Sequence, residues 1–585
     1  MVELSGGPKI DKTDATVINF DNLIDNHKER VEQIPETKDI PPFVFSFEDI
    51  AYKNVLHSVS NSLESGKMTA ILGPSGAGKT TLLKIISGRK RQTRGVISSN
   101  GHKLSSKQIR KQTAYVHQEN HLLPLLKVKE MLEYTIKLKA PKEEDPGALA
   151  DTLLKTLDLY HVKDTRIGDP IQGSSGISGG EMKRLSVAQE LISMPNTLFL
   201  DEPTSGLDSK ISESLLLHMK NLARSGMLVA LTIHQPSSDI FHMFDNIILM
   251  RSGNIIYSGS VPNCIVYLEQ LGHPCPKYTN PADHIFRVFE HFPSSPTHMY
   301  AGEQTKVPKH RTVRHKKTTY TQIARETRII ISRNFICGVR NKKYLLAKVS
   351  QAMVIGMVTS ILLYNIPGQI DHQQETNTLG CFWAISMGIF GSFSYGAVSV
   401  LFSDRKLFIK EYSSNYYSFT AYFIAKVVVD FIITCVHPLV AVPMILLSAR
   451  IGSIMHIVTC LLLGAVGHSL GLMVASLLDS VEIALAVFPA VVYPINMLTG
   501  TAVDTESIVK PLKFVQYLSP TRHAYNIMVK LHYRGETDVS PKIESQLRTF
   551  LSIEESFCVL LCGYVVLILL ASFFLKRKVL AQTKR

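Results

Sequence analysis

Hydrophobic positions are distributed unevenly along this chain of 585 residues. Up to about residue 320 they form short runs between polar positions, as in a soluble protein. From about residue 345 onward they form long segments, each approaching the roughly 20 residues that a membrane-spanning helix needs. We therefore predict a soluble domain followed by an all-α polytopic transmembrane domain of six helices, near residues 346–364, 379–401, 423–447, 454–477, 481–499 and 557–575.

Short apolar runs in the soluble part end at polar residues. Met68–Leu72 precedes a glycine-rich loop and a helical pattern, and Thr197–Leu200 precedes two carboxylates. A third run, Met227–Ile233, ends at His234. Strands that alternate with helices and end in functional side chains indicate an α/β sheet that binds its ligand at the carboxyl edge. We predict an α/β P-loop nucleotide-binding domain.

Shifts in composition define four parts of the chain. Residues 1–40 are polar without an apolar core, which predicts a disordered leader and no secretory signal. The nucleotide-binding domain then covers 41–295, a basic linker with an interfacial connecting helix covers 296–344, and the transmembrane domain covers 345–580. We expect a multi-pass protein of the plasma membrane or an internal membrane, with the first domain and both termini cytosolic.

The formal net charge of +14 has two main sources, Lys306–Lys317 and Lys576–Arg585, which flank hydrophobic segments. Basic residues at such places hold the cytosolic side of a membrane protein, so we expect the lipid bilayer and no nucleic acid as partner. For Lys306–Lys317, contact with anionic headgroups and a solvated linker stay open as alternatives. The predicted inside loop 402–420 is basic, as this orientation requires, but so is the predicted outside region 500–553.

Residues 73–80 match the phosphate-binding pattern G-x-x-x-x-G-K-[ST] in full. Its glycines let backbone N–H groups approach phosphate oxygens, its lysine reaches the β- and γ-phosphates, and its hydroxyl ligates Mg²⁺. The helix that follows directs its positive end at the anion. We predict a site for ATP and Mg²⁺ made by Gly73, Pro74, Ser75, Gly76, Ala77, Gly78, Lys79, Thr80 and Thr81.

Two carboxylates complete the predicted chemistry of this site. Asp201 ends an apolar strand, where it is expected to hold Mg²⁺ together with Thr80. The adjacent Glu202 is expected to act as general base on the attacking water.

Ile177–Glu181 is a second glycine-rich turn before a helix. Ser178, Gly179 and Gly180 offer a hydroxyl and free N–H groups at a helix N-terminus, which is a second phosphate grip. One ATP rarely needs two grips from one chain, so two chains facing head to tail are the simple solution. Asp208 lies just beyond the catalytic pair, where it could reach the partner.

This set of motifs resembles the ATP-binding cassette family. The resemblance implies that Ile177–Glu181 is the signature motif, that Asp208 is the D-loop residue, and that Gln118 is the Q-loop residue, which contacts Mg²⁺ and the membrane domain. It also implies that His234 is the switch histidine at the γ-phosphate. For the adenine ring, Tyr52 is the candidate, with two nearby phenylalanines as alternatives, Phe45 and Phe47.

The order of cassette before membrane helices resembles the G subfamily of half-transporters. Local matches include Gly272–Pro276, Lys410–Tyr412, Tyr422–Lys426 and Gln516–Pro520. The resemblance implies an ATP-hydrolysing half-transporter, a homodimer or heterodimer, that moves a lipid, sterol or amphipathic small molecule as exporter or floppase. The alternatives are an ATP-gated channel or receptor-like regulator with the same layout, and a soluble cassette protein.

Some positions depart from the subfamily or leave alternatives open. Where related exporters have a bulky apolar plug, this chain has the smaller Thr501 and Ala502, and a gate or no gate at this place stay open as alternatives. Glu411 is a candidate contact in the 402–420 loop, with a solvated carboxylate as the alternative. For Lys426 and Asp430 we favour helix capping or interfacial anchoring over a place in the transport pathway.

Overall fold

The structure is a computed structural model that describes residues 43–168, 175–276, 279–289, 319–369, 371–499, 510–534, 540, 543–544, 547–548 and 551–584. It consists of two compact units, which divide between Arg314 and His315. The predicted leader, the basic stretch Lys306–Lys317 and the pair Thr501 and Ala502 lie outside the described residues.

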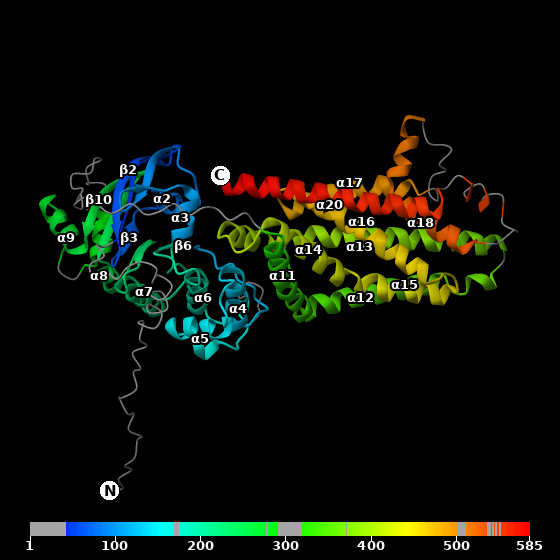
Figure 1. Ribbon diagram of the computed structural model, residues 1–585, viewed down its shortest axis with the longest axis horizontal. Helices are drawn as coiled ribbons and strands as arrows, with labels where there is room; N and C mark the ends of the chain where they lie inside the picture. Colours follow the sequence, from blue (N-terminus) through cyan, green and yellow to red (C-terminus); the bar gives the residue numbers. More distant parts are fainter. Residues whose placement is uncertain are drawn as a thin grey trace, which may run out of the picture. The chain divides into compact units, whose positions relative to one another are not determined.

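Unit 1 contains two sheets (Figure 1). The six-stranded sheet has the order β10-β9-β3-β8-β7-β6 and is parallel except for the β9–β10 pair. The four-stranded sheet has the order β2-β1-β4-β5 and is antiparallel. The strands are β1 Val44–Tyr52, β2 Leu56–Glu64, β3 Met68–Leu72, β4 Arg94–Ser99, β5 His102–Lys103, β6 Thr113–Val116, β7 Thr197–Leu200, β8 Leu228–Thr232, β9 Asn246–Arg251 and β10 Asn254–Ser260.

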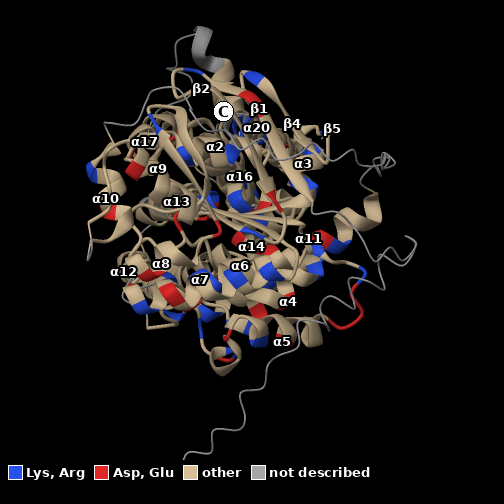
Figure 2. Ribbon diagram, turned by 90° about the vertical axis from the view of Figure 1, so that its left-hand side faces the viewer, with Lys and Arg blue, Asp and Glu red and all other residues tan. Residues whose placement is uncertain are grey.

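Helices connect the parallel strands, as an α/β fold requires. Lys and Arg are intermixed with Asp and Glu along α4 to α7 (Figure 2). The helices of this unit are α2 Lys79–Ile86, α3 Ser106–Gln112, α4 Val128–Lys139, α5 Pro146–Thr156, η1 Tyr160–Val162, α6 Gly179–Leu191, α7 Ser209–Arg224, α8 Ser238–Met243, α9 Val261–Gln270 and α10 Pro281–Arg287.

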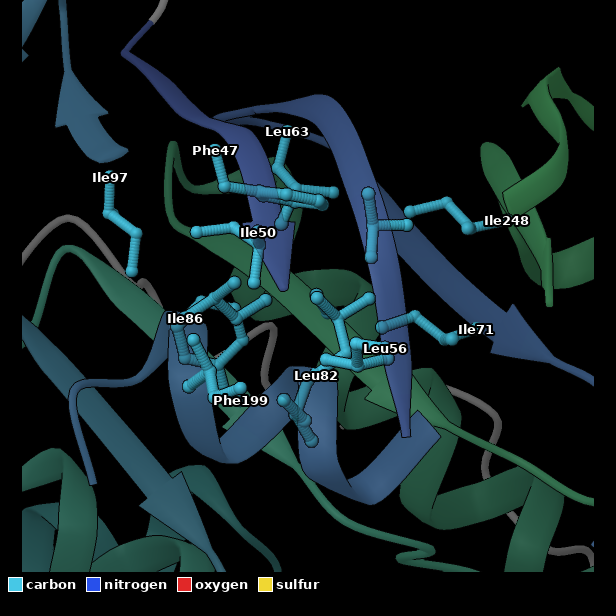
Figure 3. Packing of buried hydrophobic residues seen from close by; sticks show 14 of the residues in the cluster. Phe47, Ile50, Leu56, Leu63, Ile71, Leu82, Ile86, Ile97, Phe199 and Ile248 are labelled. Atoms are coloured by element: carbon cyan, nitrogen blue, oxygen red, sulfur yellow. The ribbon is translucent and has the colours of Figure 1, made fainter. Parts of the chain in front are cut away.

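The central strands read as continuous apolar runs because both of their faces are covered. Every residue of β3, β6, β7 and β8 is buried. Helix α2 lies between the two sheets, where Leu82 lies near Leu56 of β2, and Ile86 lies near Ile50 of β1 and Phe199 of β7 (Figure 3). This core fixes the helix that begins at the phosphate-binding loop.

Unit 2 is helical, and its helices are α11 Tyr320–Arg340, α12 Lys342–Leu362, η3 Ile366–Gly368, α13 Asp371–Ser413, α14 Phe419–Thr434, α15 Val436–Ala449, α16 Ile454–Leu477, α17 Val481–Met497, η4 Lys510–Leu518, α18 Pro520–His532 and α20 Ile553–Lys584. Among the described residues, five helical stretches are long and apolar enough to cross a membrane. They are Lys342–Gly368, Gln373–Ser413, Phe419–Ala449, Ile454–Leu477 and Ile553–Ala581.

Each of the six predicted apolar segments coincides with a helix in this unit, but two of them differ from a simple span. Val481–Met497 has 17 residues and contains Pro489 and Pro494. The third segment is divided at Cys435 into α14 and α15. Pro438 has no N–H to donate to the carbonyl of Thr434, which explains why the helix breaks there.

The predicted inside loop 402–420 is wrong for most of its length. Helix α13 continues to Ser413 and has 43 residues. At about 1.5 Å per residue it is roughly twice as long as the hydrocarbon core of a bilayer is thick. The predicted outside region 500–553 is also more ordered than a loop, because α18 is described there and nine of its 13 residues are buried.

Helices α13 and α16 run side by side (Figure 1) and approach closely through small residues. A Cβ atom added to Gly471 would lie 2.3 Å from the backbone oxygen of Ser394. The Ser394 hydroxyl donates to the backbone oxygen of Gly467 at 2.9 Å. Small residues and hydroxyl bonds across helices are typical of packing within membranes.

Candidate nucleotide site

The phosphate-binding loop joins β3 to α2. Its last residue, Gly78, has φ 97° and forms the N-cap of α2, a conformation that favours glycine. A Cβ atom on Gly73 would lie 2.3 Å from the backbone oxygen of Met250. Glycine is therefore required at both ends of the loop, and Lys79, Thr80 and Thr81 form the first turn of the helix.

Lys79 folds back onto this loop. Its ammonium group donates to the carbonyl oxygens of Gly73 at 2.7 Å and Pro74 at 3.0 Å. Burial lowers the pKa of Lys79, and the carboxylates of Glu202 and Asp201 oppose that shift. The charge is thus held inside the loop, where phosphate oxygens are expected.

Asp201 is the centre of the hydrogen-bond network in the site, and its side chain is buried. Its Oδ1 accepts from the hydroxyls of Thr80 at 2.8 Å and Thr232 at 2.9 Å, and its Oδ2 accepts from the Tyr115 hydroxyl at 2.8 Å. Burial and the neighbouring Asp201 raise the pKa of Tyr115 well above its usual range, so the phenol stays a donor.

Sequence reasoning brought together Thr80 and Asp201 but did not identify Tyr115 and Thr232 as part of the site. Tyr115 precedes the end of β6, and Thr232 ends β8. These strands flank β7, which ends before Asp201. A polar residue near the end of each apolar run was a usable signal, but only the strand order shows that the three runs are neighbours.

Replacing Tyr115 by phenylalanine is expected to weaken the site without dismantling it. The change removes one hydrogen bond to a buried carboxylate, a contact that contributes about 1.5–3 kcal/mol. We expect a higher Mg²⁺ concentration for half-maximal ATP hydrolysis, measured by titration of the purified chain. Tyr134→Phe on α4 is the matched control, and an unchanged Mg²⁺ dependence in Y115F would contradict the role assigned to Asp201.

Glu202 lies beside Asp201 in a constrained backbone conformation, with φ 44°. Its backbone N–H donates to the Thr232 hydroxyl at 2.8 Å, and its Oε2 accepts from the side-chain amide of Gln118 at 2.7 Å. The Nε2 atom of His234 lies 3.2 Å from the hydroxyl of Ser75. Of the predicted base, Q-loop and switch residues, Glu202 therefore lies beside Asp201 and bonds to Gln118, and His234 lies beside the phosphate-binding loop.

The second glycine turn is the N-terminus of α6. Ser178 is its N-cap and forms a capping box with Glu181. Asp208 caps α7 by accepting from the N–H of Ile211 at 2.8 Å. A Cβ atom on Gly180 would lie 2.3 Å from the side chain of Ile211, so the two capped helices pack closely.

Lys183 on α6 is a further functional candidate that sequence reasoning missed. It is buried and donates to the backbone oxygens of His117 at 3.1 Å and Gln118 at 2.7 Å. A buried charge needs such partners. Lys183 thereby ties the helix of the second glycine turn to the segment that holds Gln118 against Glu202.

The three aromatic candidates for stacking on adenine differ in whether a base could reach their rings. Phe45 and Phe47 belong to the buried core beneath the antiparallel sheet, so they cannot stack on a base. Tyr52 ends β1, and the ammonium of Lys90 lies 4.2 Å from the centre of its ring. Tyr52 therefore remains the candidate, although its own ring is largely buried.

Comparisons with known protein families match both units. Residues 56–205 match the family described as "ABC transporter", and residues 325–533 match an "ABC-2 type transporter" family. A further "ABC-2 type transporter" family matches residues 234–318.

Two of the relatives named here align along most of the chain, and a third aligns along part of it. An ABC transporter ATP-binding protein/permease from Caenorhabditis elegans, wht-1, is 26% identical over 81% of this chain and 77% of its own length. ABC transporter G family member 14 from Arabidopsis thaliana is 28% identical over 85% and 84%. ATP-binding cassette sub-family G member 8 from Homo sapiens is 39% identical over 39% of this chain and 34% of its own.

Proposed function

Because the chain belongs to the ATP-binding cassette family, with its cassette N-terminal to an ABC-2 type membrane domain as in G-family half-transporters, we propose that two such chains form one pump that exports a lipid, sterol or amphipathic molecule. The cassette hydrolyses ATP to drive transport across a membrane. The observation that carries the proposal is a hydrogen-bond network around Asp201. Thr80 of the phosphate-binding loop donates to Asp201 at 2.8 Å. The Thr232 hydroxyl donates to Asp201 at 2.9 Å and accepts from the backbone N–H of Glu202 at 2.8 Å.

The oxygen donors around Asp201 suit Mg²⁺, which prefers carboxylate, hydroxyl and phosphate oxygens. Thr80 and Asp201 are the proposed protein ligands, with Gln118 completing the site. Bound there, the ion would neutralise charge on the β- and γ-phosphates. Lys79 binds the same phosphates, Glu202 accepts the proton of the attacking water, and His234 contacts the γ-phosphate in this proposal.

Pairing of two cassettes is supported by the second glycine turn. The hydrogen bonds described for Ser178 stay within its own helix cap, and those of Asp208 stay at the start of α7. Both are exposed residues at the start of helices that pack together. We propose that this surface closes over the ATP of a partner chain, which is either a second copy or a related half-transporter.

Coupling to the membrane is proposed to pass through the end of α13. Arg333 on α11 forms a bidentate pair with Glu411 at 2.6 and 2.9 Å, and both side chains are buried. Tyr417 donates to the same carboxylate at 2.8 Å. Glu411 is therefore neither a solvated carboxylate nor an exposed contact. It is the anion that joins the connecting helix α11 to the end of α13.

The proposed substrate class follows from the outer faces of unit 2. Large apolar side chains are exposed along α12 and α20, including Ile361, Leu362, Val566 and Leu569. Such faces suit lipid rather than water. A substrate that enters from the bilayer is expected to be largely apolar, and we place the cassette and both termini in the cytosol.

Reconstituted vesicles provide the test of this function. With the cassette on the outside of the vesicle, ATP is expected to drive movement of at least one labelled lipid, sterol or amphipathic drug from a panel. Lys79→Met should abolish that movement, because the β- and γ-phosphates lose their cation. Lys84→Met, on the same helix, is the control. Ion current that does not require ATP turnover would favour the ATP-gated channel instead.

A further inference from the structure

A small cavity of about 40 Å³ lies inside unit 2, where α12, α13, α14 and α16 meet. Its polar side chains are Tyr344, Asp430, Thr434 and His468, and the rest of its lining is apolar. A cavity of this volume holds one or two groups the size of a water molecule. It is far too small for a whole amphipathic molecule.

His468 faces this cavity and is 1% exposed. Neither of its ring nitrogens has a hydrogen-bond partner within the described part of the chain. A neutral imidazole has one donor and one acceptor, and leaving both unpaired in a buried place is costly. His456, on the same helix and equally buried, has partners for both nitrogens, the Ser453 N–H and the Met528 oxygen.

Asp430 is the second polar group of the cavity that can accept a further hydrogen bond. Its Oδ2 lies 3.0 Å from the ammonium of Lys426, an ion pair whose geometry gives that oxygen no well-directed hydrogen bond from the residues described. Lys426 also pairs with Asp404. Lys426 is 2% exposed and pairs with two carboxylates, which corrects our preference for capping or interfacial anchoring at Lys426 and Asp430.

We propose that the cavity is a binding site for a single hydroxyl group, which accepts from the ring N–H of His468 and donates to Asp430. A hydroxyl is both donor and acceptor, as these two side chains require. A carbonyl has no hydrogen to give Asp430, an anion is repelled by it, and a metal cation is opposed by Lys426. The hydroxyl comes from an internal water molecule or from the head of an amphipathic alcohol, and only the second source rests on the proposed function.

Hydroxyl-radical footprinting of the full chain tests the site. X-ray irradiation makes radicals from water beside a side chain, and mass spectrometry then measures the oxidation of each histidine. In nanodiscs of phosphatidylcholine alone, His468 is expected to be oxidised several-fold faster than the equally buried His456. Adding cholesterol or a long-chain alcohol separates the sources, because an alcohol head protects His468, whereas a resident water leaves its oxidation unchanged.

Two valine variants on α13 provide a matched pair. Gly396 lines the cavity, and a Cβ atom there would meet only the Lys348 ammonium at 3.8 Å, so Gly396→Val is expected to fill the space and slow His468 oxidation to the rate of His456. Gly388 is exposed with open space around it, and Gly388→Val should change nothing. Oxidation of His468 no faster than His456 in every lipid mixture would overturn the proposal. ATP hydrolysis, measured in the same nanodiscs, tests the proposed function separately.

Discussion

Replacing Glu202 by glutamine is expected to abolish steady ATP hydrolysis while ATP binding persists. Loss of a general base typically slows a reaction by about 10²–10⁴-fold. Lys79, Thr80 and Asp201 keep their places in this variant, because their hydrogen bonds do not involve the Glu202 side chain. Hydrolysis would be followed by phosphate release and binding by a fluorescent ATP analogue.

The matched control for this change is Glu213→Gln, an exposed glutamate on α7. It makes the same chemical substitution outside the site and should leave both measurements unchanged. Undiminished hydrolysis in E202Q would remove Glu202 as the base. Loss of analogue binding would instead show that the Glu202–Gln118 contact of 2.7 Å organises the phosphate site.

Arg333→Met is expected to produce the largest loss of stability in unit 2. The change leaves Glu411 buried, at 1% exposure, with the Tyr417 hydroxyl as the side-chain donor that remains among the described residues. Removing one partner of a buried ion pair costs about 3–5 kcal/mol. Thermal unfolding in nanodiscs should show a clearly lower midpoint, and transport should fall more than ATP hydrolysis if the pair couples the two units.

Two further variants distinguish the orphaned charge from a general loss of packing. Arg328→Met, at an exposed position on α11, should leave the unfolding midpoint unchanged. Adding Glu411→Gln to Arg333→Met removes the uncompensated charge and should restore much of the stability. If the double variant were as unstable as R333M alone, lost packing and not the buried carboxylate would account for the effect.

The local chemistry of the nucleotide site was predictable because each motif combines its residues over a short stretch. Gly73 to Thr80 and the pair Asp201 and Glu202 could be assigned from the strand that precedes each. Tyr115 and Lys183 could not, because their roles depend on which strands and helices are neighbours. Tyr115 reaches Asp201 only since β6 pairs with β7.

For unit 2, the positions of the apolar segments could be predicted from the sequence, but the burial of its charged residues could not. Hydrophobicity located the six apolar segments, but it says nothing about which polar residues find partners inside a bundle. Lys426 reads as an interfacial anchor when alone, and Asp404 and Asp430 make it a buried cation. Likewise, the basic residues at 405–410 suggested a loop. Helix α13 nevertheless continues through them, and its side chains Leu401, Phe408 and Glu411 are buried.

The most direct measurement is an experimental structure of the full-length E202Q chain in nanodiscs with ATP and Mg²⁺. The account predicts a head-to-tail pair of cassettes in which Lys79 of one copy and Ser178 of the other contact the same γ-phosphate. An ATP molecule enclosed by a single chain, with Ser178 of every copy remote from phosphate, would contradict it.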